Sequence, residues 1–183
     1  MERAYASFFA SSSVMAPYVT RLLPLPPVEP APHPEVLPLA FLLGTWLGEG
    51  KGEYPTIQAF AYGEEIRFWH VGKPFLAYTQ RTWALDDGRP LHAEMGYWRP
   101  QPGGRIELVM SHPTGVVEVS QGTLSGSSID VASTALGLTG SAKEVTRLER
   151  SFRIEGDVIT YEIRMAAVGI PLTHHLSAEL KRS

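Results

Sequence analysis

The chain has 183 residues, of which 44% are hydrophobic and 19% charged, with a formal net charge of -3 and no cysteine. This length suits one domain with a substantial core, and the composition is ordinary for a globular protein. The charge gives no reason to expect a nucleic acid as a partner, because phosphate binding needs a clustered basic surface. The lack of cysteine excludes disulfides, zinc-cysteine sites, iron-sulfur clusters, thiolate-ligated heme and covalent c-type heme attachment.

No apolar stretch reaches the roughly 18 residues of a membrane-spanning helix. The N-terminus carries Glu2 and Arg3 and lacks a continuous apolar block before a cleavage site. We therefore expect a cytoplasmic protein with no membrane partner.

Residues 1–34 are rich in alanine, serine and proline. Proline at this density favours an extended, solvated chain, because it cannot donate to a strand ladder. We interpret residues 1–34 as a tail and residues 35–183 as the folded domain. A short helix is expected over residues 38–43, since proline suits the first helical turn and Gly44 suits the end. Its apolar side would cover one mouth of the fold that follows.

From Gly44 onward, short strand-like segments alternate with turn residues. Strands are expected over residues 44–51, 56–70, 74–85, 91–100, 104–112, 115–121, 127–136, 143–154, 157–168 and 172–181. The short connections imply antiparallel neighbours, and closure removes the two exposed edges of an open sheet. We predict an all-β fold, an antiparallel barrel of about ten strands with a short N-terminal helical cap and room for a ligand.

Three glycines of the first expected strand, Gly44, Gly48 and Gly50, lie an even number of residues apart and so share one face. They leave one face of the strand without side chains, so that the strand can bend or approach another backbone. We expect Trp46 to fill the space that they leave. A nucleotide site is a poor interpretation, because the GxGxxG spacing and the following helix are missing.

The histidines are the residues most capable of chemistry. We expect His92, His112 and one of His174 and His175 to share the barrel interior. None shows the spacing of a zinc protease, and no group of acidic residues accompanies them in the sequence, which argues against zinc hydrolysis. A neutral imidazole on a strand is a good ligand for heme iron, although a strand histidine is more often structural.

Alternation in the last strand separates an apolar from a polar face. The apolar face holds Leu172, His174, Leu176, Ala178 and Leu180. The polar face holds Thr173, His175, Ser177, Glu179 and Lys181. Alternation alone therefore favours His174 as the residue that points into an apolar interior.

The run from Gly44 to Ile57 strongly resembles the signature of the nitrobindin family of heme-binding β-barrels, GxWxGxG followed by a YPTI-like segment. The resemblance continues through residues 70–75, 90–97, 114–119 and 142–145 and closes with residues 171–176. It covers residues 36–182 and omits the tail. It also implies a barrel like those of fatty-acid-binding proteins and lipocalins.

In that family the proximal heme ligand is the histidine directly before the leucine of the terminal motif, which is His175 here. The resemblance thus favours His175 over His174, and implies that the polar face points inward or that a local irregularity shifts the register. By the same matching, His92 and His112 lie on the distal side, with Met165 in the lining. Several relatives carry glutamine in place of His112, so its side chain has no obligatory catalytic role.

Family members also use a threonine and a lysine around the cofactor, which correspond to Thr56 and Lys143. A hydroxyl and an ammonium group can stabilise the propionates of heme. The resemblance implies a ferric protein with non-covalent heme b that binds nitric oxide and isomerises peroxynitrite to nitrate, with His175 on the iron and His92 as a distal residue. The alternative is a heme-free carrier of a small hydrophobic ligand. The sequence allows a homodimer.

Overall fold

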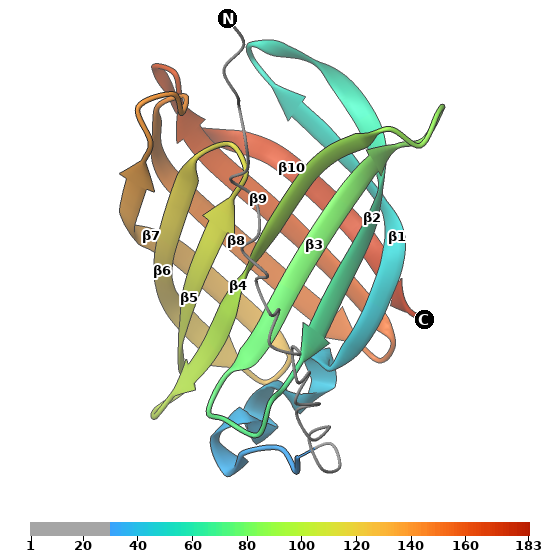
Figure 1. Ribbon diagram of the computed structural model, residues 1–183, viewed down its shortest axis with the longest axis vertical. Coiled ribbons are helices and arrows are strands. Elements are labelled where there is room, and N and C mark those ends of the chain that lie inside the picture. The colour runs from blue at the N-terminus through green and yellow to red at the C-terminus, as the bar shows by residue number, and fades with distance from the viewer. Residues whose placement is uncertain (1–29) are drawn as a thin grey trace, which may run out of the picture.

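The computed structural model describes residues 30–183. A 3-10 helix, η1 (Pro34–Leu42), precedes ten antiparallel strands. The strands are β1 (Gly44–Tyr54), β2 (Ile57–Trp69), β3 (Leu76–Ala84), β4 (Pro90–Gln101), β5 (Arg105–His112), β6 (Val116–Ser125), β7 (Ser128–Leu138), β8 (Val145–Glu155), β9 (Val158–Ala167) and β10 (Ile170–Arg182). Each strand pairs with its neighbours in sequence, and β1 also pairs with β10, so the sheet closes into a barrel (Figure 1). The predicted ten-stranded antiparallel barrel is confirmed.

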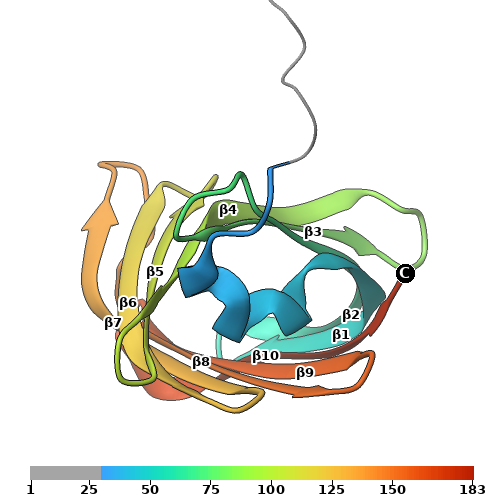
Figure 2. The ribbon, with the colours of Figure 1, turned by 90° about the horizontal axis from the view of Figure 1, so that it is seen from below.

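The expected helix is present but lies earlier in the chain. It begins at Pro34, where the Nδ1 atom of His33 accepts a hydrogen bond of 3.2 Å from the amide of Glu35. Three apolar side chains, Val36, Leu39 and Leu42, are buried against the barrel core. As expected, η1 lies across one end of the barrel (Figure 2). Most of the expected tail, residues 1–29, lies outside the described residues.

Glycines on the inner face of β1 allow close packing, as expected. A Cβ atom at Gly48 would overlap the backbone carbonyl of Glu179 on β10. At Gly50 and Gly52 it would overlap the rings of Tyr62 and Phe60. The expectation that Trp46 fills this space is therefore wrong, because two aromatic rings of β2 occupy it.

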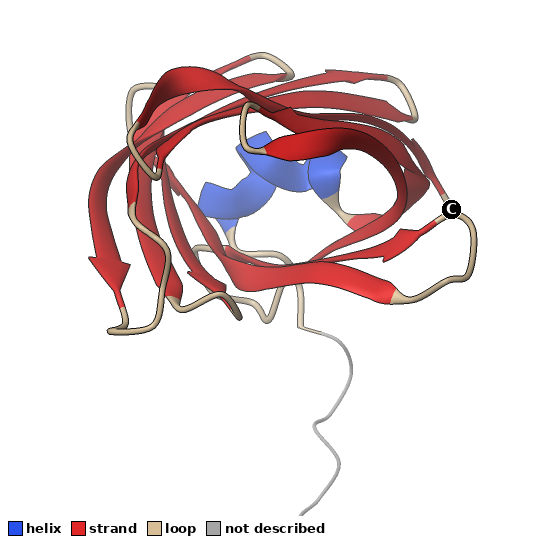
Figure 3. Ribbon diagram, turned by 90° about the horizontal axis from the view of Figure 1, so that it is seen from above, coloured by secondary structure: helices blue, strands red, loops and turns tan. Residues whose placement is uncertain are grey.

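Trp46 instead closes the end of the core that lies under η1. It is fully buried, and its Nε1 donates a hydrogen bond of 2.7 Å to the carbonyl of Leu42. The guanidinium of Arg182 lies 4.1 Å from the centre of the indole ring. The opposite end of the barrel is open, and Figure 3 looks through it toward the helix. Within residues 30–183, no helix has both the length and the apolar character needed to cross a membrane.

Candidate functional site

A cavity of about 760 Å³ occupies the open end of the barrel. This volume is typical of sites for small molecules and cofactors. Its walls carry many apolar side chains, including Ile57, Phe60, Leu91, Val116, Val145, Leu148, Ile163, Met165 and Leu176. Polar side chains from the connections between strands also line it, namely Thr56, Thr114, Ser141 and Lys143. The cavity therefore combines largely apolar walls with a polar rim, and it also reaches the charged side chains of Glu94 and Arg150.

A β-bulge in β10 decides which histidine enters this cavity. In the register with β9, His174 lies opposite Arg164 and Leu176 lies opposite Ile163, so His175 is an extra residue without a partner. Such a bulge breaks the alternation of side chains locally. As a result, both His175 and Leu176 line the cavity.

His174 lies on the outer face of the barrel, where its Nδ1 is 3.1 Å from a carboxylate oxygen of Glu162. The expectation from alternation that His174 points inward is therefore wrong. Alternation correctly predicts which side chains of β10 point inward from Leu176 onward, but the prediction fails on the other side of the bulge, at His174.

The imidazole of His175 has a defined tautomer. Its Nδ1 lies 3.1 Å from the carbonyl oxygen of Glu53, which can only accept, so this nitrogen carries the proton. Burial lowers the pKa of His175 below its usual 6.5, which keeps the ring neutral. Nε2 then retains a free lone pair on a ring that lines the cavity, which is the state that a metal-ligating histidine needs.

Tyr54 holds the same wall in place. Its ring meets His175 edge-on, with centroids 5.3 Å apart. Its hydroxyl accepts a hydrogen bond of 2.9 Å from the amide of Ala167, and lies 3.3 Å from the carbonyl of Met165. These contacts join β1 to β9 across β10, and so support the bulged segment from both sides.

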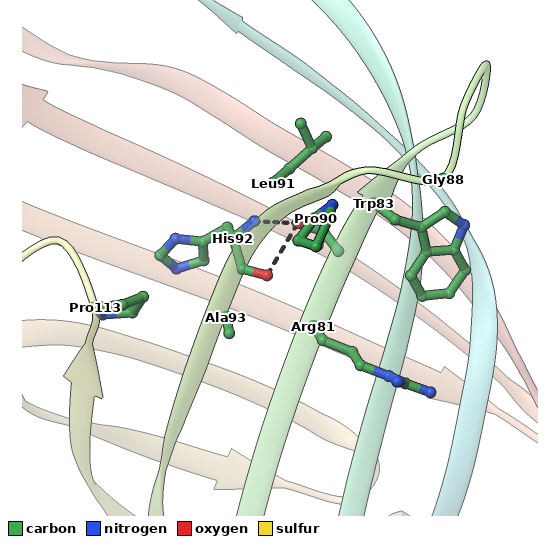
Figure 4. A pocket seen from close by; sticks show the side chains of 9 residues that line it. Arg81, Trp83, Gly88, Pro90, Leu91, His92, Ala93 and Pro113 are labelled. Carbon is green, nitrogen blue, oxygen red and sulfur yellow. Dashed lines mark hydrogen bonds between the residues drawn. The ribbon is translucent and has the colours of Figure 1, made fainter.

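His92 and His112 lie across the barrel from His175. They belong to β4 and β5, and β5 is five strands from β10 in either direction around the ring. Their rings stack with centroids 5.7 Å apart. The backbone of His92 is bonded to the hydroxyl of Thr82 on β3, with its amide donating at 3.0 Å. Figure 4 shows the His92 ring turned toward Pro113 and away from Arg81.

His112 lies between two carboxylates. Its Nδ1 is 3.2 Å from Glu94 and its Nε2 is 3.4 Å from Glu118, and its side chain is only 7% exposed. Burial alone would lower the pKa of His112, but the carboxylates of Glu118 and Glu94 outweigh burial and raise it to about 9. This imidazole therefore carries a proton at neutral pH.

Arg150 on β8 completes a buried ionic group with these side chains. Its guanidinium donates two hydrogen bonds to Glu94, of 2.9 and 3.0 Å, and two to Glu118, of 2.9 and 3.3 Å. Although burial favours the neutral acid, Arg150 and His112 lower the pKa of Glu118 to about 2. Arg150 also holds the pKa of Glu94 well below its usual value against the effect of burial. The two carboxylates and two cations balance one another.

The expectation that no acidic residues accompany the histidines is wrong. Glu94 and Glu118 surround His112 because separate strands bring them together, and Arg150 is 56 residues from Glu94 in sequence. The alternation of residues along the strands did contain a signal for this buried ionic group. Glu94, Glu118 and Arg150 occupy the same strand faces as the buried Trp98, Val116 and Phe152.

A third buried glutamate, Glu64, has a different environment. Glu64 on β2 accepts hydrogen bonds from the hydroxyl of Tyr161, the nearer at 2.7 Å, and from the amide of Gln80. Burial raises the pKa of Glu64 to about 7, and the hydrogen bonds offset this only in part. Glu64 therefore titrates near neutral pH, whereas Glu118 does not.

The remaining predicted residues also line the cavity. Thr56 lies in the turn between β1 and β2, and Lys143 lies in the connection before β8, each just outside the strand in which we expected it. Met165 lies on β9. A neutral histidine, an apolar interior and a rim with a hydroxyl and an ammonium group fit heme, which has an apolar ring and two charged propionates.

Comparison with known proteins agrees with this geometry. A family model described as "THAP4-like, heme-binding beta-barrel domain" matches residues 35–182. Peroxynitrite isomerase 2 of Mycobacterium marinum is 55% identical over 154 residues, covering 82% of this chain and 96% of that protein. Peroxynitrite isomerase 1 of Mycolicibacterium paratuberculosis is 57% identical over 155 residues, with the same shares covered.

A solved structure is also similar. The crystal structure of Rv2717c from M. tuberculosis superposes with a TM-score of 0.78 at 48% identity, covering 83% of this chain and 99% of that one. The match to the family model, over most of the folded part of the chain, agrees with the family expected from the sequence motifs. The chain belongs to the THAP4-like heme-binding β-barrel family, the nitrobindin family.

Proposed function

We propose that this chain binds heme through His175 and isomerises peroxynitrite to nitrate. The observation that carries the proposal is the bulge in β10. It brings the neutral imidazole of His175, whose Nδ1 is hydrogen-bonded to the carbonyl of Glu53, into a cavity of about 760 Å³. Family membership supports heme as the cofactor. The names of the relatives, which are peroxynitrite isomerases at 55% and 57% identity, support the reaction.

Three of the predicted residues, His175, Lys143 and Thr56, have a defined task in this proposal. When bound, heme supplies a ferric iron that acts as a Lewis acid toward the peroxynitrite anion. His175 would hold the iron through Nε2, and the carbonyl of Glu53 fixes the tautomer and orientation of the imidazole. Lys143 and Thr56, which line the rim of the cavity, would stabilise the propionates. The apolar walls limit the access of water, which suppresses side reactions.

We further propose that the cofactor is heme b, held without a covalent link, and that nitric oxide is a second small ligand. The chain has no cysteine with which to form a thioether to a heme vinyl group. Acid extraction into an organic solvent should therefore release all of the heme. Nitric oxide added without oxygen should shift the Soret band of the loaded protein.

The adjacent histidines provide a matched test of the ligand. His175→Ala removes the imidazole that lines the cavity, whereas His174→Ala removes its neighbour on the outer wall. We expect the wild type and His174→Ala to show a Soret band after reconstitution with hemin, and His175→Ala to show none after gel filtration. A normal, retained Soret band in His175→Ala would exclude this ligand.

The reaction is tested by following peroxynitrite decay and the yield of nitrate. Hemin-loaded wild type and His174→Ala should accelerate decay and raise the share of nitrate among the products, and His175→Ala should do neither. A wild-type chain that is colourless, refuses hemin and binds a fluorescent fatty acid would instead favour the heme-free carrier. The two functions therefore give opposite results with the same protein.

A further inference from the structure

Three side chains on the wall opposite His175 place ligand atoms close together. His92 and Glu94 are two residues apart on β4 and so share its inner face, and His112 ends the neighbouring β5. One nitrogen or oxygen from each lies within 4.8 Å of the others. Glu94 Oε2 is 3.2 Å from His112 Nδ1 and 3.9 Å from His92 Nε2.

These separations are close to those of ligands that share one ion. Atoms bound at about 2.1 Å with tetrahedral or octahedral angles are about 3.0 to 3.4 Å apart. The Glu94 and His112 atoms already have this spacing. His92 needs to approach by less than about 2 Å to reach this spacing from both partners, and its 32% exposed side chain has room to rotate.

The surrounding residues support the first two ligands in the way that metal sites require. Tyr78 donates a hydrogen bond of 2.8 Å to Oε1 of Glu94, and Arg150 takes one lone pair of Oε2 at 3.0 Å, which leaves the other lone pair of Oε2 for an ion. His112 Nε2 is buried and has no well-aligned hydrogen-bond partner among residues 30–183. It lies 3.4 Å from Glu118, so when Nδ1 binds an ion, Nε2 carries the proton and has a carboxylate acceptor.

An ion has a path to these atoms and room for another ligand. All three side chains line the main cavity. His92 also lines a neighbouring hollow of about 550 Å³ beside Pro90 and Pro113 (Figure 4). A coordination position on the cavity side is therefore accessible to water or a small anion, as in metal sites that keep one position open.

The charges and the ligand types define the class of ion. His112 carries a proton in the free site, and an ion that binds there displaces it. Glu94 and Glu118 against Arg150 then leave a net charge of -1 around the two neutral imidazoles. Two imidazole nitrogens and one carboxylate oxygen suit Zn²⁺, Fe²⁺ or Co²⁺ rather than Ca²⁺ or Mg²⁺, which prefer oxygen. We infer that His92, Glu94 and His112 form a binding site for a divalent transition-metal ion, separate from the heme ligand.

The site is tested with Zn²⁺ alone, on the full chain as purified and without an affinity tag. Equilibrium dialysis against a series of Zn²⁺ concentrations, with zinc and iron measured by mass spectrometry, gives a dissociation constant for zinc whatever the heme content. We expect one saturable zinc per chain. His112→Gln and His92→Ala should each weaken binding by more than about 100-fold, because loss of an outer-shell partner alone costs about 10- to 100-fold.

His92→Ala removes a partly exposed ring that lies 3.9 Å from Glu94 and leaves the closer pair of Glu94 with Arg150 in place, so it tests the site in a chain that remains folded. His174→Ala is the matched control, because it removes an imidazole paired with Glu162 on the outer wall and should leave zinc binding unchanged. His175→Ala should lose iron and keep zinc, which separates this inference from the proposed heme ligand. Absence of saturable zinc binding in the wild type, or binding that survives both His92→Ala and His112→Gln, would overturn the inference.

Discussion

The two walls of the cavity are held together in different ways. On the β1 and β10 side, glycines let two backbones approach closely, a bulge turns His175 inward, and the partner of its ring is a backbone carbonyl. On the side of β4, β5, β6 and β8, the wall is held together by buried ion pairs among Glu94, Glu118, Arg150 and His112. One wall depends on backbone geometry and the other on side-chain charge.

This difference gives the same residue type two protonation states in one cavity. Burial beside a carbonyl lowers the pKa of His175, whereas two carboxylates raise that of His112 to about 9 against the effect of burial. A neutral imidazole offers a lone pair to a metal without first losing a proton. On the charged wall, the carboxylates that now hold a proton on His112 are also those that would hold a metal cation there.

Arg150→Met should have the largest effect, because it leaves Glu94 and Glu118 buried without their main counter-charge. Removal of one partner from a buried ion pair costs about 3–5 kcal/mol of unfolding free energy. Urea unfolding at pH 7 measures this loss. Arg81→Met is the control, since Arg81 forms an ion pair with Glu65 with 68% of its own side chain exposed, and should cost less than about 1 kcal/mol. Equal losses in the two variants would refute the role of charge in this wall.

Glu64→Gln should change how stability depends on pH. The folded-state pKa of Glu64, about 7, is above its usual 4.5, so the wild type loses stability as the pH rises from 4.5 through 7. Glutamine keeps an acceptor for Tyr161 and removes the buried charge. We expect the variant to match the wild type near pH 5 and to be more stable by about 2–3 kcal/mol at pH 8 in urea unfolding.

Glu65→Gln is the control for that experiment, because the same substitution is made at the next residue, whose carboxylate pairs with the exposed Arg81. Its effect should stay below about 1 kcal/mol at both pH values. A Glu64→Gln variant with the same pH dependence as the wild type would show that Glu64 is ionised throughout.

Gly48→Ala tests the wall that depends on backbone contact. The added methyl group would overlap the carbonyl of Glu179, so β1 and β10 must move apart, at a cost of about 2 kcal/mol. Gly137→Ala on β7 is the matched control, because its Cβ would meet only Val117, at 3.8 Å. We expect that control to be neutral in thermal unfolding. If both variants unfold at the wild-type temperature, close approach is not the reason for glycine in β1.

Tyr54→Phe should have the smallest effect. It removes the hydroxyl that bonds to Ala167 and Met165, and keeps the ring that contacts His175. We expect a loss of about 1 kcal/mol in urea unfolding. The Soret band after hemin reconstitution should remain, since the Glu53 carbonyl still orients the imidazole. Loss of hemin from this variant would mean that the hydroxyl, rather than the ring, supports the bulge.

Much of the fold was predictable because its signals are local. Alternating apolar residues and turn residues placed ten strands within a few residues of their observed ends, and closure followed from the short antiparallel connections. The close approach at Gly48 followed from glycine's lack of a side chain. The occupants of the space beside Gly50 and Gly52 come from β2, and strand pairing is needed to identify them.

The site was predictable only in part. Resemblance to a family selected His175, and alternation selected His174, because a period of two cannot register one extra residue in a strand. The acidic partners of His112, Glu94 and Glu118, were missed because they come from other strands. Like Arg150, they are marked in the sequence only by sharing a strand face with buried apolar residues.

The sequence by itself determined the barrel, its cap and its motif, because periodicity, turns and glycine spacing act between residues that are close along the chain. Resemblance to a family favoured His175 over His174, but only the tertiary structure shows why His175 enters the cavity, since a bulge is defined by the pairing of β10 with β9. It also decided the charge of the opposite wall, where Glu94, His112, Glu118 and Arg150 meet across four strands. Charges interact through distance in space, and closure of the barrel sets that distance.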